Sequence, residues 1–268
     1  MNSKINLKVL ILDQDFYALE SLNSYLAWDR RTRVIALTYT LDEAVAYLKG
    51  LAVAELPDVI LLDSELFKTT AALSAGLAKL RSLVAHVMIL CLGRSADGER
   101  AAAAFDAGAR GYLLRNEVKI QIVGAIVYAL EHKFIITPGI REAASTHFDV
   151  RIFNAAVVPS EREYPGLTDR VRQALWLCVI EGLPAHLAAD EMGVSPHTVR
   201  SYIKEGYRIL ESYDDTAYPE DMGPLERAFM RFTALEDPDD AAQKAASEPP
   251  DQQNHSDHPD QKDPRPEE

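Results

Sequence analysis

The chain has 268 residues, enough for one large domain or two of ordinary size, and its 47% of hydrophobic residues can form a buried core. No apolar run reaches the roughly 20 residues that a membrane-crossing helix needs, and the N-terminus lacks the apolar centre of a signal peptide. We therefore expect a cytoplasmic protein with no membrane partner. The net charge is −13, but residues 236–268 hold eleven acidic and three basic side chains, so most of the excess lies in the C-terminal segment.

Residues 8–133 alternate short apolar runs with amphipathic stretches. Continuous apolar strands separated by helices are typical of a parallel sheet covered on both faces. The sequence therefore predicts a doubly wound, flavodoxin-like α/β domain over residues 1–133. Five parallel strands are expected, at residues 9–12, 33–38, 59–62, 87–92 and 111–114.

The last stretch of this domain is expected to be one helix over residues 117–132. Its apolar stripe serves either packing within the domain or dimerisation, and both uses stay open. The stripe consists of Ile120, Val123, Ile126, Val127 and Leu130.

A proline-containing, irregular stretch over residues 134–166 is expected to be a linker. The two cysteines, Cys91 and Cys178, stand alone inside apolar segments, which indicates buried structural thiols rather than a disulfide or a zinc site.

Polar residues follow several of the predicted strands. Ligands and chemistry gather at the carboxyl ends of the strands in a doubly wound sheet. Asp13, Asp63 and the region of Gly93 fall there.

Residues 7–133 resemble the receiver domains of NarL/FixJ-type response regulators. The motifs that carry the resemblance are Val-Leu-Ile-Leu-Asp at 9–13, Pro-Asp-Val-Ile-Leu-Leu-Asp at 57–63 and Ala-Gly-Ala-Arg-Gly-Tyr-Leu-Leu at 107–114. Receivers of this family phosphorylate themselves on an aspartate that matches Asp63. The resemblance also implies Mg²⁺ held by Asp13 and Asp63, because phosphoryl transfer to a carboxylate needs its negative charge neutralised.

Three positions depart from the family pattern. Gln14 stands where the family has a second acidic residue, which weakens the cation site; Asp15 is a substitute only if it swings in. Gly93 replaces a hydroxyl residue. Arg115 replaces a lysine and is expected to form a bidentate pair with Asp63 or Asp13.

These departures predict a receiver without a normal phosphorylation cycle, and slow phosphorylation at Asp63 is the alternative. Tyr112 matches the aromatic switch of the family, and half-buried packing is its other interpretation.

Residues 167–235 predict a small all-α domain. Thr168 begins a helix that ends at Gly182, a second helix over 184–192 buries Leu187, Ala188 and Met192, and a third begins at Ser195-Pro196. Short helices joined by a tight turn form a helix-turn-helix. This segment resembles the LuxR-type DNA-binding domain, through the residues Leu167, Thr168, Arg170, Leu175, Gly182, Ala188, Met192, Gly193, Val194, Ser195, Thr198, Val199 and Leu210.

Basic residues follow one side of the third helix. The resemblance implies that Arg200, Ser201 and Lys204 enter the major groove of double-stranded DNA, while Thr198 and Arg208 reach phosphates. His197 lies on the same stripe. Residues 167–215 nevertheless contain five basic and eight acidic residues, and Gly206 replaces an apolar core position. The domain should therefore bind DNA modestly, in a salt-sensitive manner and as a homodimer.

Beyond this domain, an amphipathic helix around 224–232 is either a dimer element or a packed cap. Residues 236–268 predict a disordered acidic tail, because few apolar side chains are present to offset the entropy of ordering. The tail either solubilises the chain or competes with DNA for the basic face.

The whole sequence thus predicts a DNA-binding transcription regulator and no independent enzyme. A conventional response regulator with a histidine kinase partner and an adaptor without DNA affinity are the alternatives. A small ligand, a regulatory protein or abundance is the expected control if phosphorylation is lost.

Overall fold

A computed structural model describes residues 5–147, 149–214, 216 and 218–236. The acidic segment predicted over 236–268 lies outside these residues, apart from Glu236. Within them, no helix is long and apolar enough to cross a membrane.

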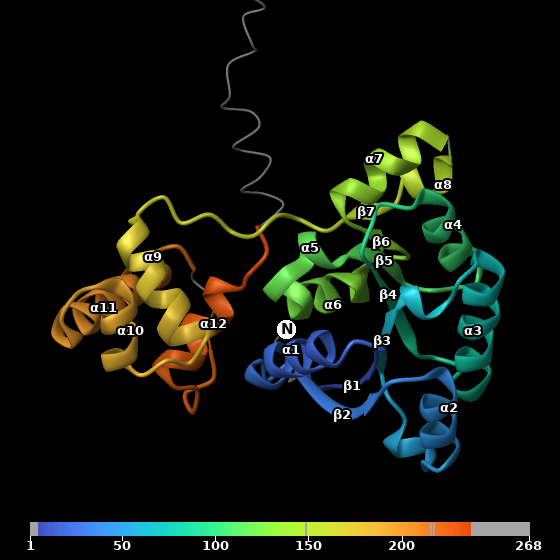
Figure 1. The fold of residues 1–268 in the computed structure, drawn as a ribbon, viewed down its shortest axis with the longest axis horizontal. Coiled ribbons are helices and arrows are strands. Elements are labelled where there is room, and N and C mark those ends of the chain that lie inside the picture. Colours follow the sequence, from blue (N-terminus) through green and yellow to red (C-terminus); the bar gives the residue numbers. More distant parts are fainter. Residues whose placement is uncertain (1–4, 148, 215, 217, 237–268) are drawn as a thin grey trace, which may run out of the picture. The chain divides into compact units, whose positions relative to one another are not determined.

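Residues 7–157 form one parallel sheet with the strand order β2-β1-β3-β4-β5-β6-β7 (Figure 1). Every neighbouring pair of strands is parallel, as the alternation of strands and helices predicts. The strands are β1 (Leu7–Leu12), β2 (Thr32–Thr38), β3 (Val59–Asp63), β4 (Met88–Gly93), β5 (Gly111–Leu114), β6 (Ile135–Ile136) and β7 (Ala156–Val157).

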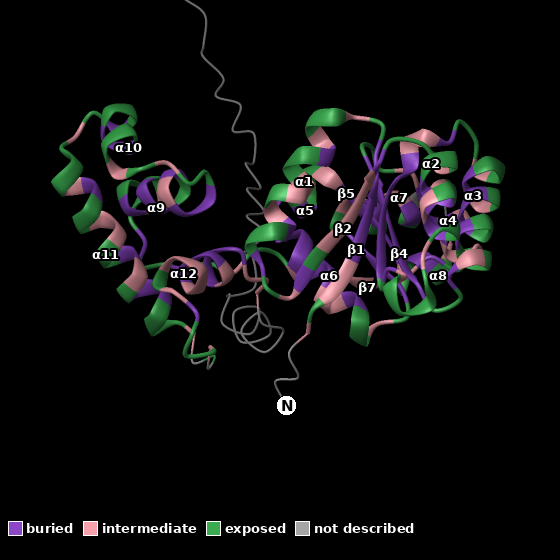
Figure 2. Cartoon of the chain, turned by 90° about the horizontal axis from the view of Figure 1, so that it is seen from below, coloured by how far each residue is buried: buried purple, intermediate pink, exposed green. Residues whose placement is uncertain are grey.

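The two faces of the sheet have separate cores because successive strand residues point to opposite sides. In β1, Leu10 and Leu12 belong to one core and Val9 and Ile11 to the other. Figure 2 shows the middle of the sheet buried between two layers of helices, whereas the edge strand β2 is mostly of intermediate exposure. The first core is covered by α2 (Leu41–Lys49), α3 (Thr70–Leu83), α4 (Gly98–Asp106) and α7 (Pro138–His147), and the second by α1 (Phe16–Trp28) and α6 (Ile122–Glu131).

The expected number of five strands is wrong, and the stretch expected to be irregular contains regular elements over residues 135–157. Residues 134–166 contain β6, β7, α7 and the short helix α8 (Val150–Phe153), so the sheet has seven strands and extends beyond β5. Pro138 is the first residue of α7, a place where a missing N–H costs nothing. The segment therefore continues the sheet domain.

The single helix expected over 117–132 is also interrupted. Arg115–Val118 forms α5, Lys119 adopts a positive φ of 42°, and α6 begins at Ile122. The predicted stripe packs inward at Val123 and Ile126, whereas Leu130 is exposed. Most of the stripe therefore serves packing within the domain.

The helical domain has the predicted order of helices. They are α9 (Asp169–Leu175), continued by a π-helical turn (Trp176–Ile180), then α10 (Ala185–Met192), α11 (Pro196–Ser212) and α12 (Pro224–Phe232). Thr168 caps α9 and Ser195 caps α11, each accepting a backbone N–H, as predicted. Gly193 ends α10 with a φ of 65°, a conformation that glycine adopts without strain.

Two expectations for this domain need correction. Leu187, expected to be buried in α10, is 46% exposed. Gly206 was expected to weaken the core by replacing an apolar side chain, but there is no space for one. It is buried where α11 crosses α9, and a Cβ there would lie 2.8 Å from Leu175 Cδ1. The glycine allows the two helices to approach closely.

The apolar face of α12 packs within the chain. Ala228, Phe229 and Phe232 are buried in the same core as Leu210 of α11.

Cys91 is fully buried and burial raises its pKa to about 12, so it is a structural thiol as predicted; Cys178 is half-buried.

Replacing Gly206 by Ala should destabilise the protein. Helix propensity alone would favour alanine by about 1 kcal/mol. The contact with Leu175 should reverse this sign and give a net loss of about 1–3 kcal/mol in the free energy of unfolding, measured by urea denaturation.

The matched control is the double variant Gly206→Ala/Leu175→Val, which shortens the contacting side chain and should recover part of the loss. A stabilised Gly206→Ala protein would contradict the proposed close helix contact.

Candidate functional site

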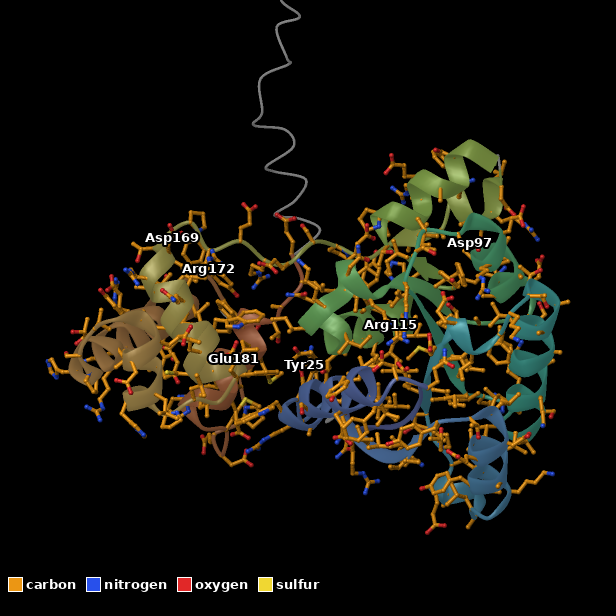
Figure 3. The ribbon with its side chains drawn as sticks, in the orientation of Figure 1. Tyr25, Asp97, Arg115, Asp169, Arg172 and Glu181 are labelled. Carbon is orange, nitrogen blue, oxygen red and sulfur yellow. The ribbon has the colours of Figure 1, made fainter. Side chains whose placement is uncertain are left out.

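The first candidate site lies where β1, β3, β4 and β5 end at one edge of the sheet. Asp13 follows β1 and Asp63 ends β3. Arg115, labelled in Figure 3, follows β5 as the first residue of α5. The parallel register places these strand ends side by side. The three side chains that the sequence places at the strand ends thus lie together.

Arg115 lies between the two acidic residues. Its Nη1 is 2.6 Å from Asp13 Oδ2, and its Nη2 is 2.8 Å from Asp63 Oδ1. The sequence predicts a bidentate pair with one of these carboxylates. The structure instead has one guanidinium nitrogen on each of the two. The planar guanidinium has its nitrogens arranged as a fork and can contact two separate carboxylates. The ammonium of a lysine, in contrast, is one compact point charge.

Burial makes this arrangement electrostatically demanding. Asp13 and Asp63 are each 1% exposed. Burial raises the pKa of Asp13; Arg115 opposes this, and the nearby negative charge of Asp63 adds to it. Two carboxylates and one guanidinium leave one net negative charge, so the carboxylates depend on Arg115 for compensation.

The residues present do not fit the Mg²⁺ that the resemblance implies. Mg²⁺ takes oxygen ligands at about 2.0–2.1 Å, and here the guanidinium is the positive partner of both carboxylates. Within the described ranges, no group of three His, Cys, Asp or Glu side chains is placed to hold a metal ion. The arrangement therefore has its own internal cation.

Gln14 and Asp15 do not complete a cation site either. Gln14 is exposed. Asp15 caps α1 by accepting the backbone N–H groups of Tyr17 and Ala18, and its other oxygen lies 3.3 Å from Arg94 Nη2. The side chain that the sequence offered as a substitute ligand is thus held elsewhere.

Gly93 and Tyr112 are in close contact at the same edge of the sheet. Tyr112 is fully buried, not half-buried, and a Cβ on Gly93 would lie 2.8 Å from its Cε1 and Oη atoms. The Tyr112 hydroxyl is 3.0 Å from Ser64 Oγ, and burial raises the pKa of Tyr112 to about 12, so it stays protonated. Glycine at position 93 therefore leaves room for the inward tyrosine ring.

Sequence reasoning missed two residues that hold the loop after Asp63. Ser64 is fully buried beside Tyr112. Arg100 of α4 donates to the backbone carbonyls of Ser64 and Phe67, each at 2.9 Å. No periodicity identifies Arg100, because its role depends on where α4 packs, although the position of Ser64 directly after Asp63 was a usable signal.

The second candidate site is the outer face of α11. His197, Arg200 and Lys204 are exposed, as are Ser201 and Arg208, and Thr198 is half-exposed. Figure 2 shows α11 with exposed and buried stretches along its length. Val199, Gly206 and Leu210 are buried on its inner side.

The basic side chains of α11 are available to a ligand. Among the residues that the structure describes, Arg200, Lys204 and Arg208 form no ion pair with an acidic side chain. Two hydroxyls are already engaged: Thr198 Oγ1 lies 2.8 Å from Ser195 Oγ, and Ser201 Oγ donates to the His197 carbonyl. The face thus offers free cations on a capped, regular helix.

The chain is similar to known regulators of transcription. Residues 165–210 match the family model described as Sigma-70, region 4. A relative from Mycobacterium tuberculosis, "Probable transcriptional regulatory protein NarL", is 28% identical over 178 residues, which are 66% of this chain and 76% of the relative.

Two solved structures are also similar. The RcsB response regulator of Salmonella typhimurium has a TM-score of 0.47 and 13% identity, with 90% of this chain and 99% of that chain covered. The signal receiver domain of NarL from Mycobacterium tuberculosis has a TM-score of 0.40 and 23% identity, with 47% of this chain and 98% of that chain covered.

Replacing Arg115 by Met should leave two buried carboxylates without a cation. We expect the free energy of unfolding at pH 7 to fall by about 3–5 kcal/mol. Burial raises the pKa of Asp13, and without Arg115 nothing from that side chain opposes this, so part of the lost stability returns as the pH falls toward 4 and Asp13 is protonated. Guanidinium denaturation at the two pH values measures this.

Arg94→Met is the matched control, because Arg94 forms an exposed ion pair with Asp15 and should contribute less than about 1 kcal/mol. Millimolar Mg²⁺ should stabilise the Arg115 variant and not the wild-type protein. An equal loss at both pH values, or stabilisation of the wild type by Mg²⁺, would contradict the cation role of Arg115.

Proposed function

We propose that this chain, a NarL-type response regulator by homology, binds specific DNA sequences through α11 and does so without ordinary aspartyl phosphorylation. The family predicted from the sequence is confirmed by the helix-turn-helix match and by the NarL relative. The predicted order of an α/β domain followed by a helix-turn-helix is confirmed by the fold. The observation that carries the proposal is the exposed, unpaired basic face of α11.

The DNA-binding role follows from the shape and chemistry of α11. A major groove of about 12 Å admits one α-helix, and an arginine can donate two hydrogen bonds to O6 and N7 of guanine. Arg200 lies near the N-terminal end of α11, where the recognition helix of a helix-turn-helix meets base edges. We therefore assign base contacts to Arg200, Ser201 and Lys204.

Phosphate contacts are assigned to Thr198 and Arg208, and His197 lies on the same face. The excess of acidic residues over 167–215 keeps the general attraction to DNA low. Specific affinity then depends on few contacts, so a homodimer on two half-sites is the expected assembly.

The residues around Asp63 are the reason for proposing that phosphorylation is lost. An aspartate that attacks a phosphoryl group needs a cation to neutralise the approaching negative charges. Asp63 is instead paired with Arg115. Gly93 stands where the family pattern has a hydroxyl residue. A small ligand, a partner protein or the abundance of the regulator is the proposed control in place of a histidine kinase.

Incubation with acetyl phosphate and Mg²⁺ should leave the intact mass of the protein unchanged. The reason is that the guanidinium of Arg115 already neutralises the carboxylates of Asp13 and Asp63, which are the expected Mg²⁺ ligands. A gain of one phosphoryl group, absent in Asp63→Asn, would restore the conventional response regulator.

Replacing Arg200 by Ala should strongly weaken sequence-specific binding in a gel-shift series with sites selected from random DNA. Loss of a bidentate guanine contact should cost about 1–3 kcal/mol of discrimination. Arg33→Ala is a matched control, because Arg33 is exposed on β2 and its removal changes the net charge equally.

Unchanged affinity and preference in Arg200→Ala would contradict the assigned role. A wild-type protein that selects no sequence at any salt concentration would favour the adaptor function instead.

A further inference from the structure

Glu205 is an acidic residue on the face that we assign to DNA. It is exposed, one residue after Lys204 and three before Arg208. Within the part of the chain that the structure describes, Glu205 forms no ion pair, although basic side chains lie nearby in sequence on the same helix. Its carboxylate is therefore free to meet whatever approaches α11.

The helix geometry places Glu205 at one edge of the exposed face and Arg200 at the other. Successive residues turn by about 100° around the helix axis, so Arg200 and Glu205 are about 140° apart. Ser201 and Lys204 lie between them, and the buried residues Val199, Gly206 and Leu210 lie on the opposite side. A helix inserted in a groove would thus present Arg200 and Glu205 to its two sides.

The chemistry of a carboxylate restricts what Glu205 can meet there. An ionised carboxylate only accepts hydrogen bonds, and beside phosphates it is repelled. The major groove offers two base donors, the amino groups of cytosine and adenine. The adenine amino group lies beside the acceptor N7, which repels a carboxylate, whereas cytosine presents N4–H₂ as its donor.

We propose that Glu205 is a specificity-determining residue that accepts a hydrogen bond from cytosine N4 in the major groove. The five-residue separation from Arg200 is about 7.5 Å along the helix axis, so this cytosine belongs to a different base pair from the guanine read by Arg200. The inference rests on the proposed function and adds a second base to the expected site. It also assigns Glu205 a penalty against sequences that lack the donor.

The test is selection of binding sites from random DNA by the full-length chain and its variants. Glu205→Ala should lose the cytosine preference at one position, on the order of 5- to 100-fold in relative affinity, and keep the guanine preference of Arg200. Glu205→Gln should shift that position toward adenine, because an amide can both accept from N6 and donate to N7.

Glu191→Ala is the matched control: Glu191 is exposed on α10, outside the recognition helix, and its loss changes the charge equally. It should leave every position of the selected site unchanged. Both Glu205 variants replace an exposed helical residue, so they should fold, which circular dichroism verifies.

Two results would overturn the inference and leave the proposed function intact. One is a uniform gain in affinity for all sequences in Glu205→Ala, which is expected from simple repulsion of phosphates. The other is an unchanged preference at every position. If the wild-type chain selects no sequence, the proposed function fails and this inference fails with it.

Discussion

The receiver-like domain depends on the ion pairs that Arg115 makes with Asp13 and Asp63. Removing either carboxylate from water is costly, and burying two of them together is tolerable only with a cation between them. Here that cation is covalently part of the chain, so it is present at every moment and at every concentration of divalent ions. Three strand ends, after β1, β3 and β5, are thereby joined by one side chain.

The rest of the pocket is consistent with this internal cation. Arg100 holds the loop after Asp63 through two carbonyls, Tyr112 is buried against Ser64, and Gly93 leaves space for the tyrosine ring. Each contact favours one arrangement of the loops, and none requires a phosphoryl group. A signal that alters this domain must compete with these contacts, which a ligand or protein can do only by binding another arrangement more tightly.

Much of this architecture could be predicted from local chemistry. Buried parallel strands, the Thr168 and Ser195 caps and the exposed stripe of α11 each have a local signature. Strands β6 and β7 do not, because two residues are too short for a period, and Pro138 looks like a helix breaker although it begins α7. The contacts of Gly206 with Leu175 and of Arg100 with the β3 loop depend on packing between distant elements, which no short pattern records.

The cations of the helical domain fall into two groups. Arg231 is paired with Asp214 and Glu211 and lies over the Tyr218 ring, and Arg170 donates to the Met192 carbonyl. Within the described residues, Arg200, Lys204 and Arg208 have neither an ion pair nor a side-chain hydrogen bond to another part of the chain. In a domain with more acidic than basic residues, α11 thus carries a local group of exposed positive charges. If this surface binds DNA as proposed, it gains little from nonspecific contact, and its selectivity depends on short-range contacts with base edges.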